Sequence, residues 1–334
     1  MSVIRSLENM EPQKTKVYDT YWRFACERQN IFMRKFMGGE DNLTSDPILM
    51  EYKFTNAYRA SDRTSQYLIR NVIYNGPYSP EDTLFRILLF KTFNRIETWQ
   101  RLELAVGDIS LNTFNKDVYG KVLGDYYSNG IQLYSGAYIM ASGKTAFGFD
   151  RKYMNHLSLI EHMMRDHISL KIAKCSSLEE LYTVLLQYPT IGAFLAYQYA
   201  IDINYSELVD FDEMEFVVAG PGAKAGIRKC FSNFSKFTDS YLIRYMCENQ
   251  AEEFARLDLP FQTLWGRKLQ LIDCQNIFCE TDKYSRAKHP DVKDKSARTR
   301  IKQKYKKKAN RIDFFYPPKW NINDKLQAGG IVMG

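Results

Sequence analysis

The sequence has no long apolar run and few of the residues that usually hold metal ions. No stretch approaches the roughly 18 apolar residues that a membrane-spanning helix needs, and the N-terminus has no apolar signal core. The four histidines are scattered, and the six cysteines include no Cys-x-x-Cys pair. These absences argue against a membrane protein, a zinc site and an iron–sulfur site. We therefore expect reduced thiols, a cytoplasmic location, no metal ion and no cofactor.

A nucleotide-binding phosphate loop is also missing. The Gly-Lys-Thr at residues 143–145 is preceded by Tyr138 at the position where the GxxxxGK[ST] motif requires glycine. The sequence therefore gives no support to a kinase site of the phosphate-loop type.

The chain does have an ordinary globular composition and an uneven charge. Of its 334 residues, 45% are hydrophobic and 25% charged, and the net charge is +7. Residues 283–311 carry thirteen Lys or Arg against two Asp, a net +11, which leaves about −4 for the rest of the chain. This basic arm favours a polyanionic partner such as DNA.

Apolar residues recur at helical spacing through most of the chain, so we expect a mostly α protein. We predict three regions: a polar lead-in at 1–17, one helical domain at 18–285, and a basic C-terminal arm and tail at 286–334. The predicted helices cover 18–36, 45–58, 61–73, 79–102, 155–175, 177–187, 238–255 and 260–284.

Two glycine turns, PTIG and AGPGAK, each open a predicted helix in residues 188–231. Such turns point several backbone N–H groups at an anion, and cations follow the second turn. The alternative is that both turns are only structural. As DNA-phosphate ligands we predict Gly192, Gly220, Gly222, Lys224 and Arg228.

Polar residues interrupt two otherwise core-like segments, FTNAYRASDRTSQYLIRNVIY and LQLIDCQNIFCETDKY. They form either a buried ion-pair network or solvated helix face, or else the wall of a pocket that grips a phosphate or a base edge. The pocket candidates are Asn56, Arg59, Asp62, Arg63, Asp273, Gln275, Asn276 and Glu280.

These two segments, together with YWRFACERQNIF, ILLFKTFNRIETW, IGAFLAYQYAIDINYS and FVVAGPGAKAGIRKCF, resemble one family over residues 18–285. It is the helical domain associated with 5-hydroxymethyluracil DNA kinase, grouped with the α-glutamyl/putrescinyl thymine pyrophosphorylases. The resemblance implies a fold related to the helix–hairpin–helix DNA glycosylases. It also implies double-stranded DNA carrying modified pyrimidines as the partner, with no obligate protein partner evident.

We first expect a DNA glycosylase that flips out and excises a hypermodified pyrimidine, in antiphage defence. A carboxylate would stabilise the sugar cation or activate water, and Asp202, Glu215 and Asp239 are the candidates. Lys224 is a candidate for Schiff-base chemistry. Lys224 with Asp239, and the PTIG turn with Asp202 or Glu215, are rival placements of the glycosylase Lys and Asp.

Two alternatives remain open. The first is a transferase that replaces pyrophosphate on 5-hydroxymethyluracil with an amine, in which Arg59 and Arg63 would bind the diphosphate. The second is a non-catalytic module that only recognises modified DNA.

Overall fold

The computed structural model describes residues 11–292, 299–307 and 312–328. Within these ranges the chain is built from helices, and the extended pairings are isolated bridges rather than strands of a sheet. The prediction of a mostly α protein is therefore confirmed.

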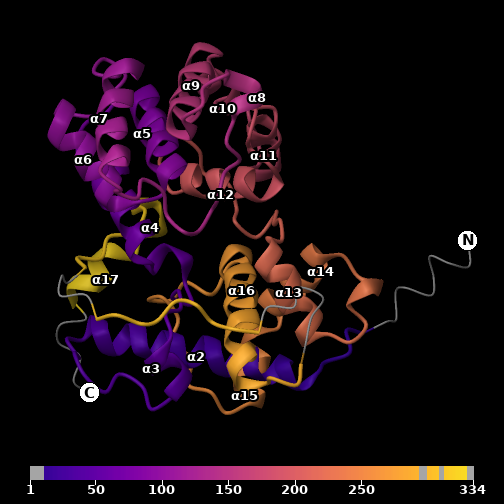
Figure 1. The fold of residues 1–334 in the computed structure, drawn as a ribbon. Helices are drawn as coiled ribbons and strands as arrows, with labels where there is room; N and C mark the ends of the chain where they lie inside the picture. The colour runs from indigo at the N-terminus through magenta and orange to yellow at the C-terminus, as the bar shows by residue number, and fades with distance from the viewer. Residues whose placement is uncertain (1–10, 293–298, 308–311, 329–334) are drawn as a thin grey trace, which may run out of the picture. The chain divides into compact units, whose positions relative to one another are not determined.

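The chain divides into two compact units, which Figure 1 shows in the colours of the sequence. Unit 1 contains Met1–Ser61, Phe216–Arg311 and Gln327–Gly334, and unit 2 contains Asp62–Glu215 and Ile312–Leu326. The domain limits predicted from the sequence, and a helix–hairpin–helix relationship, remain predictions.

Unit 1 is organised around two long helices. The first is α2 (Lys16–Phe36), and the second is α16 (Leu271–Lys288), which packs against α2. Tyr21 and Phe278 carry this contact, with ring centroids 4.8 Å apart. The other helices of unit 1 are α3 (Pro47–Glu51), η1 (Arg59–Ser61), α13 (Pro221–Cys230), η3 (Phe234–Lys236), α14 (Asp239–Glu248) and α15 (Gln250–Arg256).

Helices α13 and α16 pack closely because α13 presents glycines to α16. A Cβ added at Gly222 would lie 2.2 Å from the Cys279 sulfur. One added at Gly226 would lie 2.1 Å from the Phe278 carbonyl oxygen. The two glycines are four residues apart, so they share one face of α13. Gly222 thus has a packing role whatever its role toward phosphate.

Part of the basic arm is fixed to unit 1. The N–H of Lys53 donates to the Gln303 carbonyl at 2.9 Å, and the N–H of Tyr305 donates to the Glu51 carbonyl at 2.9 Å. This antiparallel pairing ends α3 early, so the helix predicted over 45–58 stops at Glu51. Residues 293–298 and 308–311 of the predicted arm lie outside the described ranges.

Unit 2 is a second group of helices, in which α5 (Pro80–Phe93) contacts α12 (Ala193–Asn204) and α9 (Lys152–Arg165). The helix predicted over 79–102 is in fact two, because Asn94 adopts left-handed φ 48° and ends α5. The remaining elements are α4 (Arg63–Tyr67), η2 (Leu68–Ile73), α6 (Ile96–Val106), α7 (Lys116–Ser128), α8 (Lys144–Phe147), α10 (Ile168–Ile172), α11 (Leu178–Leu186), η4 (Pro318–Trp320) and α17 (Asn323–Ala328).

Other helix boundaries also differ from the prediction. The helices predicted over 155–175 and 238–255 are each two helices, α9 with α10 and α14 with α15. Helix α2 begins after Thr15, whose side chain accepts a hydrogen bond from the N–H of Val17, rather than at the predicted Tyr18. Residues 260–270 are not helical, because Trp265 and Gly266 have positive φ and form a tight turn closed between Leu264 and Arg267.

Candidate functional site

One face of α12 carries an aromatic, an amide and a carboxylate side chain, which together could bind and act on a base. Phe194, Gln198 and Asp202 are spaced four residues apart, so they follow one another along the same face of the helix. Phe194 near the N-terminus is half-buried, whereas Gln198 and Asp202 are buried. An aromatic ring, an amide and a carboxylate therefore form a row that runs inward from the surface.

Asp202 forms a buried ion pair with Lys91 of α5. The Lys91 Nζ lies 2.9 Å from Asp202 Oδ2, and the two side chains are only 1% and 2% exposed. Removing two charges from water costs several kcal/mol per ion before their attraction offsets it. A fully buried pair is therefore weak evidence for stability, and it is compatible with a functional role.

An aromatic residue covers this ion pair. The Lys91 Nζ lies 4.0 Å from the centre of the Tyr138 ring, and that ring stacks on Phe194 at 5.8 Å and 13°. Tyr138 has φ 57°, a conformation that bulky residues rarely adopt. Strained residues of this kind concentrate at functional sites. Tyr138 thus closes the site at a cost in backbone strain.

The segment that carries Tyr138 is anchored by His156 of α9. The His156 Nδ1 is 3.0 Å from the Tyr134 hydroxyl, and Nε2 is 2.8 Å from the Ala141 carbonyl. The carbonyl only accepts, so Nε2–H donates to it, and Nδ1 accepts from Tyr134. Burial, with a smaller contribution from the Lys152 charge, lowers the pKa of the imidazole to about 4, although the hydrogen bond to Ala141 raises it. The ring is neutral at pH 7 and fixes both ends of the segment.

This anchor predicts an acid-sensitive stability. The folded pKa lies below the unfolded value, so the unfolded chain binds the proton first as the pH falls from about 6.5 to 4. His156 should therefore cost about 3 kcal/mol of unfolding free energy across that range. Urea unfolding at pH 7 and pH 4.5 measures it. His156→Leu should be less stable at pH 7 but lose less on acidification; an equal loss in both proteins would contradict the assignment.

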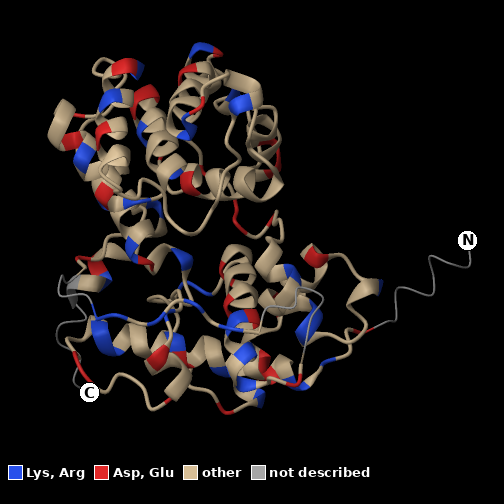
Figure 2. Ribbon diagram, viewed as in Figure 1, with Lys and Arg blue, Asp and Glu red and all other residues tan. Residues whose placement is uncertain are grey.

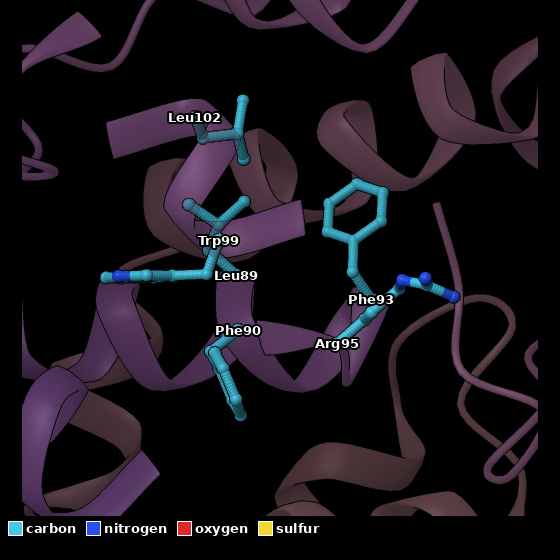
Figure 3. Close-up of a pocket in the computed structure, with 6 residues that line it drawn as sticks. All are labelled: Leu89, Phe90, Phe93, Arg95, Trp99 and Leu102. Atoms are coloured by element: carbon cyan, nitrogen blue, oxygen red, sulfur yellow. The ribbon is translucent and has the colours of Figure 1, made fainter. Parts of the chain in front are cut away.

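Two other kinds of site find no support. The described residues contain no group of three or more His, Cys, Asp and Glu side chains that could hold a metal ion. The apolar pocket in Figure 3 is too narrow to admit a water molecule, and belongs to the packing of α5 against α6. Its lining residues are Leu89, Phe90, Phe93, Arg95, Trp99 and Leu102.

The predicted catalytic residues fall in separate places. Asp202 is buried in unit 2, whereas Glu215 of the same unit is exposed. Lys224 and Asp239 meet on unit 1, with the Lys224 Nζ 3.7 Å from Asp239 Oδ2. The structure therefore brings together one of the two rival pairs. Catalytic roles for these residues remain predictions.

The parts of the two predicted pocket segments that lie in unit 1 are joined by hydrogen bonds. The N–H of Arg59 donates to Asp273 Oδ1 at 2.8 Å, and the N–H of Thr55 donates to Glu280 Oε2 at 3.3 Å. The Asn56 amide donates to the Ser61 carbonyl at 2.8 Å. These contacts explain why the polar groups interrupt apolar sequence. Of the remaining pocket candidates, Gln275 is buried and Asn276 half-buried in unit 1, and Asp62 and Arg63 are half-buried in unit 2.

The two glycine turns do open helices. Gly192 is the N-cap of α12 and Gly220 that of α13, and neither helix has a side-chain cap or an acidic residue in its first turn. Lys224 and Arg228 are exposed on α13. This geometry is compatible with the predicted phosphate contacts, which remain a prediction.

The sequence prediction missed Lys91, Tyr138, Phe194 and Gln198. The four-residue spacing along α12 is visible in IGAFLAYQYAID, and a lone lysine inside ILLFKTF is visible too. Tyr138 had no such signal, because it lies in an irregular segment between α7 and α8.

Comparison with known proteins agrees with this helical architecture. Residues 15–294 match the family model described as "5-hmdU DNA kinase, helical domain". A protein of Bacillus phage SP10, "5-hmdU DNA kinase", is 27% identical over 290 residues. The match covers 80% of this chain and 45% of the phage protein, so the chain spans less than half of that relative. No solved structure matches. No helix among the described residues is long and apolar enough to cross a membrane.

These matches overturn the first functional prediction. Both names are those of a kinase, a transferase that acts on 5-hmdU DNA, whereas a glycosylase is a hydrolase that removes the base. The predicted excision reaction is wrong, and the antiphage role that depended on it is dropped. With most of its length matched by one family model, this chain belongs to the family of the 5-hmdU DNA kinase helical domain.

Proposed function

We propose that this chain is a DNA-base hypermodification transferase, which replaces pyrophosphate on 5-hydroxymethyluracil in DNA with an amine. The observation that carries the proposal is the family match over residues 15–294, supported by the 5-hmdU DNA kinase relative. The relative's name covers a protein of more than twice the matched length. Its kinase reaction is therefore an alternative to test rather than a property of this chain.

The Gly-Lys-Thr segment does not support phosphoryl transfer at a phosphate loop. Lys144 is the first residue of the four-residue helix α8 and follows Gly143, whose φ is 74°. Its Nζ lies 2.6 Å from Asp150 Oδ1. A phosphate-loop lysine instead reaches the β- and γ-phosphates from a glycine-rich loop. With Tyr138 in place of the first glycine, this segment lacks that loop.

The proposed reaction takes place at the 5-methylene carbon of the flipped base. The bond between this carbon and the diphosphate oxygen breaks, a bond to the amine nitrogen forms, and pyrophosphate leaves with the bonding electrons. The attacking amine loses a proton to a base, for which we propose Asp202. Lys91, which already neutralises Asp202, would hold the carboxylate in place and face the departing negative charge.

The aromatic and amide groups of the same site suit a pyrimidine. A flipped base needs flat surfaces to replace its lost stacking, and Tyr138 and Phe194 supply two. The Gln198 amide offers a donor and an acceptor to the base edge. Because Asp202 and Lys91 are buried, we propose that the segment bearing Tyr138 moves aside when the base enters.

Double-stranded DNA is the proposed partner, and the described part of the basic arm supplies cations for it. Lys302 and Lys306 are exposed and make no ion pair with any described residue, whereas Lys304 pairs with Glu51. Figure 2 shows the Lys and Arg positions of unit 1 in blue. Exposed lysines on a fixed extended segment suit contacts to phosphates, which carry no sequence information.

Replacing Lys302 and Lys306 with glutamine should weaken duplex binding and its salt dependence together. The slope of log K against log salt is negative, and each lost phosphate contact reduces its magnitude by about 0.9. In the double variant the magnitude of the slope should therefore fall by nearly 2. Titrations at several salt concentrations measure the slope. Lys121→Gln with Lys174→Gln, two exposed lysines of unit 2, is the matched control. An unchanged slope, or an equal change in the control, would rule out this surface.

Release of pyrophosphate tests the proposed function. Duplex DNA carrying diphosphorylated 5-hydroxymethyluracil is mixed with the full chain, with and without putrescine. Pyrophosphate that appears only with the amine supports the transferase. In a parallel reaction with ATP and DNA carrying unphosphorylated 5-hydroxymethyluracil, phosphate transfer to the base would establish the kinase instead. Binding without any product would leave a recognition module.

A further inference from the structure

We propose that unit 1 also carries a binding site for single-stranded DNA, in which Tyr241 stacks on an unpaired base. The site is formed by the exposed face of α13, η3 and the first turn of α14, and we call it the stacking surface. It rests on the proposed function only in taking DNA as the ligand.

A pair of aromatic rings is presented at this surface. Phe237 and Tyr241 stack with centroids 5.2 Å apart and an interplanar angle of 9°, and Tyr241 is 46% exposed. Thr238 caps α14 by accepting a hydrogen bond from the N–H of Tyr241 at 3.1 Å. The cap and the partner ring hold Tyr241 in place, so little side-chain entropy is lost when a base stacks on it.

The elements that form this surface also carry cations. Lys224 and Arg228 lie four residues apart on the exposed side of α13, and Lys236 is exposed on η3. The Arg228 guanidinium is 5.9 Å from the centre of the Phe234 ring. One carboxylate, Asp239, lies 3.7 Å from the Lys224 Nζ. Proteins that bind single strands without sequence preference combine a line of cations, which contact the phosphates, with an exposed aromatic ring on which a base stacks.

A single strand fits this surface better than a duplex. The faces of paired bases are covered by their neighbours in the stack, so a duplex can offer only phosphates to the cations. An exposed ring gains a stacking partner only when a base is unpaired. Extrusion of the target base opens the duplex locally and provides such bases. The stacking surface would then hold DNA in its opened state.

Binding of two unmodified DNAs to the full chain tests the proposal. A fluorescein-labelled 20-nucleotide oligo(dT) and a labelled 20-base-pair duplex are titrated by anisotropy at one salt concentration. Tyr241→Ala should weaken single-strand binding about fivefold or more, since stacking on one ring is worth about 1–3 kcal/mol. Duplex binding should change less than about twofold. Tyr241→Phe should keep single-strand affinity, because the ring remains.

Tyr127→Ala is the matched control. Tyr127 is 50% exposed in unit 2, lies 6.0 Å from the Tyr153 ring and has the Arg151 guanidinium 5.0 Å from its centre. The Tyr127→Ala variant should bind both DNAs with the same affinity as the unsubstituted chain. Unchanged oligo(dT) affinity in Tyr241→Ala, or an equal loss for both DNAs, would overturn the proposal. Neither DNA carries a modified base and no turnover is measured, so a failed transferase assay leaves this result standing.

Discussion

Replacing Lys91 with methionine and Asp202 with asparagine in one variant should abolish base modification while the chain stays folded. A buried ion pair can often be exchanged for neutral residues of similar volume at little cost in stability, whereas removing one partner costs about 3–5 kcal/mol. Loss of the proposed base should lower the rate by about 100-fold or more. Urea unfolding and amine-dependent pyrophosphate release, measured on the same samples, separate the two effects.

Unit 1 offers a matched control in the pair of Lys229 and Asp282. Their charged atoms lie 2.8 Å apart, and the side chains are 3% and 2% exposed. Lys229→Met with Asp282→Asn makes the same two substitutions where no chemistry is proposed, and it also removes the carboxylate that pairs with Arg286. This variant should keep activity in proportion to its folded fraction. If both double variants lose activity equally at equal stability, Lys91 and Asp202 have no special role in the reaction.

Gly226→Ala should be among the most destabilising single changes in the chain. Its Cβ would lie 2.1 Å from the carbonyl oxygen of Phe278, a backbone atom of the buried helix α16. No rotamer change relieves that clash, so the two helices must separate. We expect a loss of about 3 kcal/mol or more in unfolding free energy. The midpoint of urea unfolding measures it.

Gly222→Ala provides the comparison, because its first obstacle is a side chain. The added Cβ would lie 2.2 Å from the Cys279 sulfur, and the next atom, the Cys279 Cβ, is 3.2 Å away. Cys279→Ala should therefore restore much of the stability that Gly222→Ala loses. The same Cys279→Ala should not rescue Gly226→Ala. Rescue of both, or of neither, would contradict the packing described for α13 and α16.

Local signals predicted much of the helical architecture. The helix predicted to begin at 45 begins at Pro47 after its N-cap Asp46, whose carboxylate accepts hydrogen bonds from the N–H groups of Ile48 and Leu49. Ser79 and Ser177 cap α5 and α11 in the same way. Caps are predictable because the residues that make them lie within one turn of the helix end.

Boundaries set by tertiary contacts were not predictable in this way. The early end of α3 depends on backbone pairing with residues about 250 positions later. The apolar residues keep nearly the same helical spacing across the break at Asn94, so the pattern predicted one helix instead of α5 and α6.

Only part of the candidate site was predicted from the sequence, for the same reason. Asp202 was identified as a carboxylate behind a glycine turn, but its partner Lys91 is more than a hundred residues earlier, on a helix that looks apolar. The strained Tyr138 lies outside any periodic element. The packing between helices determines which acid pairs with which cation, and these pairings cannot be predicted from a single sequence.

The most direct test of the proposed function is mass spectrometry of the nucleosides released from diphosphorylated 5-hydroxymethyluracil DNA after incubation with the chain and putrescine. The proposal predicts an amine-substituted nucleoside with its sugar bond intact, absent without putrescine and absent from Lys91→Met with Asp202→Asn. Two results would contradict it: an unchanged substrate at full DNA binding, or, when the chain is instead given ATP and DNA with unphosphorylated 5-hydroxymethyluracil, a phosphorylated nucleoside without any amine product in the first assay.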